Sequence, residues 1–75
     1  MNLELLKQER VAKGFTQKYM AEALGFKDRS SYCQIEKGKC SVDIELANRI
    51  ASVLDLSDGR TFEIFFASKV QTSST

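Results

Sequence analysis

Residues 16–38 read TQKYMAEALGFKDRSSYCQIEKG and contain two short helical segments separated by a glycine-containing turn. Thr16 is a favourable N-cap for the first segment, and Gly25 fits a left-handed cap at its C-terminal end. Asp28 is the expected N-cap of the second segment, which runs from Arg29 to about Lys37. The stretch therefore predicts a helix, a short turn and a second helix, and this pair decides the fold.

Three further helical segments flank this pair. One extends from Leu3 to Lys13, and a short one lies near Arg60 to Ala67. Another starts near Ser41 or Asp43. At about 100° per residue, its apolar side chains share one half of the helix; they are Ile44, Leu46, Ala47, Ile50, Ala51, Val53 and Leu54. Because each connection is short, neighbouring helices must pack against one another.

The length of the chain limits it to one domain. With 75 residues, it buries only about 60% of its unfolded surface, which leaves no room for a deep catalytic cleft. A hydrophobic content of 43% with 28% charged residues is typical of a globular protein. We therefore predict an all-α fold, a compact five-helix bundle over residues 1–67, followed by a polar tail at residues 68–75.

The composition argues against an enzyme. Histidine, the commonest general base and metal ligand, is absent. Cys33 and Cys40 are too few for a disulfide framework and form no zinc set without histidine, so we expect two reduced thiols. No stretch reaches about 18 apolar residues, and the N-terminus lacks a signal-peptide pattern. We expect no cofactor, no metal, no membrane partner and a cytoplasmic location.

Charge is unevenly distributed along the chain, although its net value is only +1. Residues 7–39 hold eight Lys or Arg and four Asp or Glu, a net charge of +4, whereas residues 40–75 hold three and five, a net charge of −2. Glu4 supplies the remaining negative charge. A basic half beside an acidic half favours one anion-facing side, although an ordinary solvated surface gives the same pattern.

The helix predicted from Arg29 to Lys37 has one polar, cationic face. Arg29, Cys33, Lys37, Ser30 and Gln34 fall within about 140° of one another on a helical wheel, opposite Ser31, Tyr32 and Ile35. An arginine can bind guanine O6 and N7, and a glutamine can pair with adenine N6 and N7. The wheel alone leaves this DNA-reading face and a plain solvated face as equal alternatives.

A set of spaced residues favours the first alternative. The set comprises Arg10, Thr16-Gln17, Ala21, Gly25, Ile35-Glu36-x-Gly38 and Ile50-Ala51-x-x-Leu54. Together these residues resemble the helix-turn-helix of the phage repressor and Cro family, also called the Xre family, over about residues 3–56. No single element decides the resemblance, but the joint match is specific.

The resemblance implies roles for individual residues. Arg29, Ser30 and Gln34 match positions that read base edges, and Cys33 faces the same groove. Gln17 matches a position that holds a backbone phosphate and braces the recognition helix, where the helix N-terminus also favours an anion. The remaining candidates for phosphate contact are lysines around the two helices: Lys18, Lys27, Lys37 and Lys39.

Two further expectations concern stability and assembly. In similar proteins, the residues that match Arg10 and Glu36 form an ion pair between the first and third helices. Similar proteins also bind as two-fold dimers, and we expect no separate dimerisation domain in this chain. A dense apolar set near the C-terminus is the candidate homodimer interface, although it would equally serve to close the monomer core; it comprises Leu56, Phe62, Phe65, Phe66 and Val70.

The resemblance implies a sequence-specific binder of double-stranded DNA. We interpret the chain as a transcriptional regulator of bacterial or phage type, most simply a repressor that binds a palindromic operator. Such a protein would be associated with the nucleoid in the cytoplasm. Two alternatives within DNA binding are an antitoxin-type autoregulator and a restriction–modification controller. A third is a protein-interaction module that kept the fold, which the near-neutral net charge favours. Salt dependence of DNA binding separates this last alternative from the others.

Overall fold

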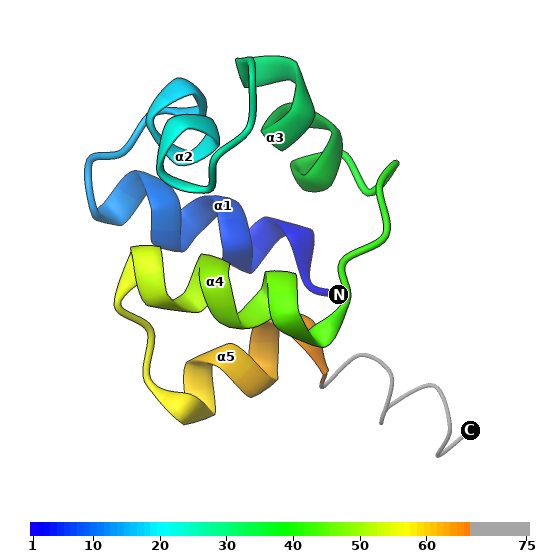
Figure 1. Ribbon diagram of the computed structural model, residues 1–75. Coiled ribbons are helices and arrows are strands. Elements are labelled where there is room, and N and C mark those ends of the chain that lie inside the picture. The colour runs from blue at the N-terminus through cyan, green and yellow to red at the C-terminus, as the bar shows by residue number, and fades with distance from the viewer. Residues whose placement is uncertain (67–75) are drawn as a thin grey trace.

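A computed structural model describes residues 1–66, which form five α-helices and no strand (Figure 1). The helices are α1 (Leu3–Ala12), α2 (Gln17–Ala23), α3 (Arg29–Glu36), α4 (Ile44–Leu54) and α5 (Asp58–Phe65). The all-α prediction is therefore confirmed. Val70 and the predicted tail at residues 68–75 lie outside the described residues, as does Ala67, the predicted end of the last helix.

Each helix begins at a polar residue that caps its first turn. The capping side chain accepts a hydrogen bond from the backbone N–H three residues later, which satisfies one of the free donors at the helix start. The five capping residues are Asn2, Thr16, Asp28, Asp43 and Ser57. The last helix was expected to begin near Arg60, but the cap at Ser57 starts it at Asp58.

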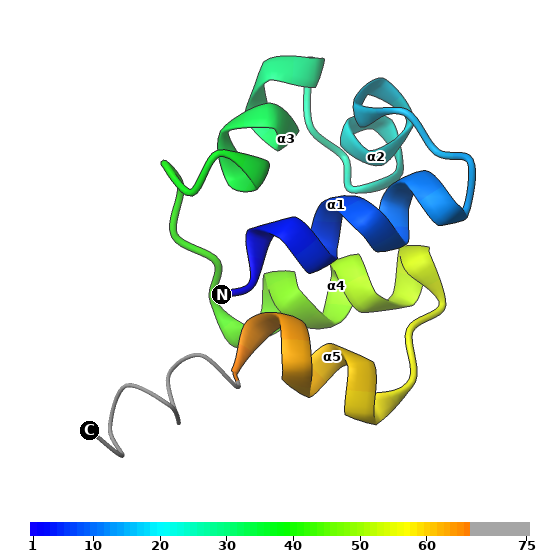
Figure 2. The ribbon, with the colours of Figure 1, turned by 180° about the vertical axis from the view of Figure 1, so that it is seen from behind.

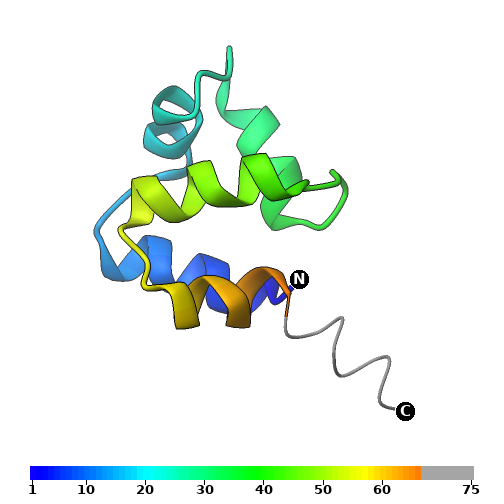
Figure 3. The same ribbon diagram turned by 60° about the horizontal axis from the view of Figure 1, so that its bottom comes forward.

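The α2–α3 pair lies on one side of α4, and α5 lies on the other side (Figures 1 and 3). The reverse view shows α1 beside α4 between these two ends of the molecule (Figure 2). All five helices contribute to one core; its fully buried large side chains are Leu6, Met20, Leu24, Tyr32, Ile35, Ile50, Leu54 and Ile64. The backbone N–H of Asn2 donates to the carbonyl of Ile64 at 2.6 Å, which joins the start of α1 to α5.

Two apolar side chains in the C-terminal half of the chain differ in burial, since Ile44 is exposed and Phe65 is buried. Ile44, in the first turn of α4, is 66% exposed, whereas Ile50 and Leu54 on the same helix are buried. Phe65 is only 8% exposed and belongs to the core. Its membership of the core agrees with the alternative that this residue closes the monomer core, and its place at a dimer interface stays a prediction.

The turn between α2 and α3 depends on Gly25 and Arg49. Gly25 has φ +84°, a left-handed conformation that residues with a Cβ rarely adopt. The Arg49 side chain of α4 donates from Nη2 to the carbonyl of Leu24 at 2.6 Å. This bond satisfies a free carbonyl at the end of α2 and holds the turn against α4. The position of α3 is thereby set by the packed helices beneath it.

Candidate nucleic-acid interface

The face of α3 that points away from the core is polar. Arg29, Ser30 and Gln34 are exposed, whereas Cys33 is half-buried among them. Tyr32 and Ile35 on the opposite face are only 0% and 1% exposed. Their burial in the core determines which face of α3 points to solvent. The side chains predicted to read base edges therefore share one side of α3, although Cys33 has less access to solvent than the other three.

The hydroxyl of Ser30 is engaged at the start of α3. It donates to Oδ1 of Asp28 at 2.7 Å, while the same carboxylate accepts from the backbone N–H of Ser31 at 3.3 Å. The side-chain hydrogen bond from Ser30 and the backbone bond from Ser31 lower the pKa of Asp28. Because its proton is used here, the hydroxyl oxygen of Ser30 remains as a hydrogen-bond acceptor on the exposed face.

Lysines surround this face of α3. Lys18 lies in the first turn of α2, Lys27 in the turn before α3, Lys37 at the C-cap of α3, and Lys39 just beyond it. All four are exposed, and none forms an ion pair with a described residue. They are therefore available as point charges for phosphate oxygens on either side of α3.

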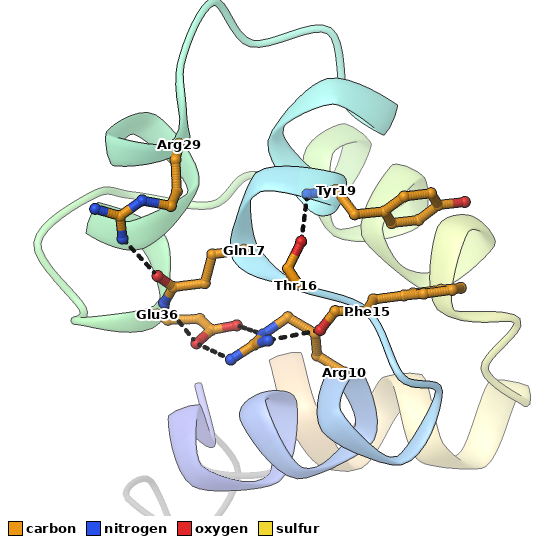
Figure 4. Close-up of polar contacts among 7 residues, drawn as sticks. All are labelled: Arg10, Phe15, Thr16, Gln17, Tyr19, Arg29 and Glu36. Carbon is orange, nitrogen blue, oxygen red and sulfur yellow. Dashed lines mark hydrogen bonds and ion pairs between the residues drawn. The ribbon is translucent and has the colours of Figure 1, made fainter.

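Arg10 and Glu36 form an ion pair beneath the polar face. Nε of Arg10 lies 2.6 Å from Oε2 of Glu36, and the two side chains are only 10% and 6% exposed (Figure 4). Nη1 of Arg10 also donates to the carbonyl of Phe15 at 2.7 Å, in the loop between α1 and α2. The arginine thus joins α1, the α1–α2 loop and the C-terminal end of α3.

Gln17 connects this ion pair to the surface of α3. Its amide Nε2 donates to Oε1 of Glu36 at 3.2 Å, and its Oε1 accepts from Nη1 of Arg29 at 3.1 Å (Figure 4). A continuous chain of hydrogen bonds therefore extends from buried Arg10 to exposed Arg29. The resemblance implied a bracing role for Gln17, and the structure identifies Glu36 and Arg29 as its partners.

The surroundings of Glu36 favour its charged form. Burial by itself would raise the pKa of the carboxyl group, but the groups of Arg10, Tyr32 and Gln17 around it hold the pKa below 4.5. Burial and the neighbouring Glu36 carboxylate raise the pKa of Tyr32 well above its ordinary value. No hydrogen bond of standard geometry joins the two groups, and the Tyr32 hydroxyl has no partner among residues 1–66.

Comparison with known proteins agrees with this geometry. The model of the helix-turn-helix family, of the Cro/C1 type, matches residues 6–59. The chain belongs to the helix-turn-helix family. A search of curated proteins and a search of solved structures each returned no match.

The match to the helix-turn-helix family includes the whole α2–α3 pair. The match extends from Leu6 within α1, through α2, α3 and α4, to the start of α5, so it includes the network from Arg10 to Arg29. Proteins of this family are DNA-binding transcription regulators, and the chain is one in this general sense. None of the helices within residues 1–66 is long and apolar enough to cross a membrane.

The helix-turn-helix domain exposes apolar side chains away from α3. Phe62 is 49% exposed and contacts the half-buried Phe66, with ring centroids 6.2 Å apart. A groove of about 880 Å³ lies between the N-terminus, the α3–α4 loop and the end of α5; Leu3, Val42, Ile44, Phe65 and Phe66 contribute its apolar lining. Sequence reasoning missed this groove, because it is formed by segments far apart in the chain.

Proposed function

We propose that this protein is a transcriptional repressor of bacterial or phage type that binds a palindromic operator as a homodimer. The observation that best supports the proposal is the exposed polar face of α3, which four lysines border, none of them in an ion pair with a residue of the described range 1–66. In this mechanism, α3 enters the major groove, where the base edges differ most clearly. Occupation of a promoter then prevents transcription. The protein acts in the cytoplasm, on nucleoid DNA.

Residues on the interface divide into two roles. Arg29, Ser30 and Gln34 read base edges, with Cys33 as a small neighbour that lets the helix approach. Gln17 and the four lysines contact phosphates and set the position of α3 in the groove; the lysines are Lys18, Lys27, Lys37 and Lys39.

Selection of bound sequences from a random DNA pool tests the proposal. A palindromic consensus whose half-sites are centred about 34 Å apart, one turn of DNA, is the expected result. Recovery of unrelated sequences with no consensus would contradict sequence-specific binding. A single, non-palindromic half-site would contradict binding as a two-fold dimer.

Substitutions on α3 should separate base contacts from phosphate contacts. We expect Arg29→Ala and Gln34→Ala each to relax the preference at one position of the half-site, at a cost of about 1–3 kcal/mol on the selected sequence. Lys37→Ala should weaken binding to all sequences alike, because a phosphate contact carries no base information. Titration of each variant against the consensus and single-base variants measures both effects. Equal weakening at every site by all three substitutions would contradict the assigned readout.

We propose a homodimer because one recognition helix contacts too few base pairs to specify a single site. One helix contacts only a few base pairs, which does not specify a site in a genome, whereas two half-sites do. Exposed Phe62, half-buried Phe66 and the groove beside Ile44 form the apolar surface on which a second copy would pack. This surface belongs to the acidic half of the chain, which is disfavoured next to phosphate.

Phe62 and Val11 offer a matched test of the homodimer. At tens of micromolar, the free protein should sediment as a dimer or as a monomer–dimer equilibrium. Phe62→Ala should shift it toward monomer, because the truncated side chain buries less apolar area against the second copy. Val11→Ala removes apolar surface from a side chain that is 57% exposed on α1, and should leave the equilibrium unchanged. A purely monomeric protein, with DNA affinity unaffected by Phe62→Ala, would overturn this interface.

One alternative has an observation in its favour. The net charge of +1 and the exposed apolar side chains Val11, Tyr19, Ile44 and Phe62 suit a protein-interaction module that has lost DNA binding. An antitoxin-type autoregulator or a restriction–modification controller would share the same DNA interface. Both would bind upstream of their own gene, so a selected operator that occurs only at other genes would contradict these two alternatives.

A further inference from the structure

We infer that residues 67–75 of the chain pack into the groove beside Ile44, with Val70 against its apolar lining and Lys69 beside the carboxylates on its rim. The groove is the cavity of about 880 Å³ between the N-terminus, the α3–α4 loop and the end of α5. The inference goes beyond the proposed function, because it requires neither DNA binding nor a homodimer.

The groove is apolar surface that the described part of the chain leaves uncovered. Ile44 lines it and is 66% exposed, although Ile50 and Leu54 on the same helix are buried. Val42 and Phe66, which also line the groove, are only half-buried. Removal of such surface from water is favourable in proportion to the apolar area. A segment that carries an apolar side chain therefore gains stability by packing there.

The position of Phe66 favours the chain's own following segment as the occupant. Phe66 is the last described residue, and its side chain lines the groove. Even in fully extended chain, Val70 follows within about 14 Å of Phe66. A site reached through so short a connection meets its partner at an effective concentration on the order of millimolar. A second copy or another protein must instead associate from solution.

The rim of the groove carries more negative than positive side chains. Asp43 is the N-cap of α4 and Glu45 lies in its first turn, and both line the groove. Both are exposed, and neither forms an ion pair with a described residue. Lys39 is the other charged side chain in the lining. A segment with a positive charge therefore suits this rim better than an acidic segment does.

The composition of residues 67–75, ASKVQTSST, matches the groove. Lys69 is the one charged side chain of this segment, and Val70 is its largest apolar side chain. Adjacent side chains of an extended chain point to opposite sides, so Val70 can face the apolar lining while Lys69 faces the acidic rim. The other side chains, apart from Ala67, are polar and uncharged and suit the solvent side of the segment.

Occupation of the groove changes what a second copy would contact. Phe62 is 49% exposed and does not line the groove, so it stays available to a second copy. A second copy that packs on Phe62 and the groove, as in the proposed homodimer, would then contact residues 67–75 rather than an open apolar lining. Packing of the segment and formation of the homodimer can therefore fail separately.

Cys40 measures directly whether the groove is covered. It lines the groove and is exposed, whereas Cys33 lies on α3 and does not line the groove. We expect Val70→Asp to accelerate alkylation of Cys40 by iodoacetamide about fivefold or more, which corresponds to a packed fraction of about 80% in the wild type. The rate at Cys33 should be unchanged. Mass spectrometry separates the two thiols, because trypsin cleaves at Lys37 and Lys39 between them.

Thr75→Asp is the matched control for Val70→Asp. It adds the same charge to the same segment without removing an apolar side chain, so the Cys40 rate should stay near that of the wild type. A negative charge beside a thiol disfavours the reactive thiolate and by itself slows alkylation. Acceleration therefore reports uncovering of the groove. Lys69→Glu should also accelerate alkylation of Cys40, because its carboxylate would face the acidic rim.

A disulfide distinguishes the chain's own segment from that of a second copy. In a Cys33→Ser background at high dilution, Val70→Cys should be oxidised by copper phenanthroline to a disulfide between position 70 and Cys40 of the same chain. The two positions must lie close together for this bond to form. Thr75→Cys in the same background should form its disulfide more slowly, because only position 70 is held at the groove.

Two measurements decide the inference, after circular dichroism has verified that each variant keeps the helical fold. Equal rates of Cys40 alkylation in the wild type, Val70→Asp and Thr75→Asp would show an open groove and overturn it. A covalent dimer as the main product of oxidation would also overturn it, because the segment of a second copy would then occupy the groove. Equal rates of disulfide formation for Val70→Cys and Thr75→Cys would do the same. All these rates are measured on the free protein, so absence of DNA binding would overturn the proposed function and leave this inference standing.

Discussion

Affinity for operator DNA should fall about 10⁴-fold when monovalent salt rises from about 50 to about 200 mM. Four exposed lysines surround α3 and form no ion pair within residues 1–66, so the proposed dimer would neutralise about eight phosphates. Release of the condensed counterions then gives a slope of about −7 for log K against log salt. Titration by fluorescence anisotropy over this range measures the slope directly.

Single lysine variants refine the salt experiment. Lys37→Ala should make the slope shallower by about 2 for a dimer, because each protomer then neutralises about one phosphate fewer. Glu22→Gln on α2 alters an exposed carboxylate outside the network and should leave the slope near the wild-type value. A wild-type slope shallower than about −2 would contradict DNA binding through these lysines and favour the protein-interaction alternative.

Local sequence signals predicted α2 and α3 well. Thr16 and Asp28 were identified as caps because their side chains compete for the first backbone N–H groups of a helix. Tyr32 and Ile35 were placed on the core side of α3 by helical periodicity alone, and both are buried. These signals depend on only a few neighbouring residues, so they can be recognised without knowledge of the rest of the fold.

The start of α5 and the orientation of its side chains were harder to predict. Gly59, a weak helix former, interrupts the helical pattern in the first turn and hides the cap at Ser57. Periodicity alone does not indicate that Phe65 packs in the core while Phe62 remains half exposed, because that choice depends on where α1 and α4 lie. The connection from Gln17 to Glu36 likewise joins residues that are 19 apart in sequence.

Glu36→Ala should be the most destabilising of the carboxylate substitutions. It leaves Arg10 charged and nearly buried without its partner, a loss that costs about 3–5 kcal/mol in comparable pairs. For a domain of this size, such a loss lowers Tm by more than about 10 °C. Glu22→Ala is the matched control, since Glu22 is exposed and its removal should change Tm by only a few degrees. Thermal unfolding followed by circular dichroism gives both values, and equal Tm values for the two variants would contradict a stabilising role of the ion pair.

The pH dependence of unfolding provides an independent check on the same ion pair. Because the folded state holds the pKa of Glu36 below 4.5, the unfolded state binds a proton more readily. The stabilisation is therefore complete above about pH 4.5 and is lost as the pH falls through the lowered pKa of the folded state. Glu36→Gln cannot be protonated at this position, so its stability should decline less steeply on the acidic side than that of the wild type. The other carboxylates contribute equally to the pH dependence of both proteins. The difference between the two pH profiles therefore measures the contribution of Glu36, the carboxylate that connects Arg10 to α3.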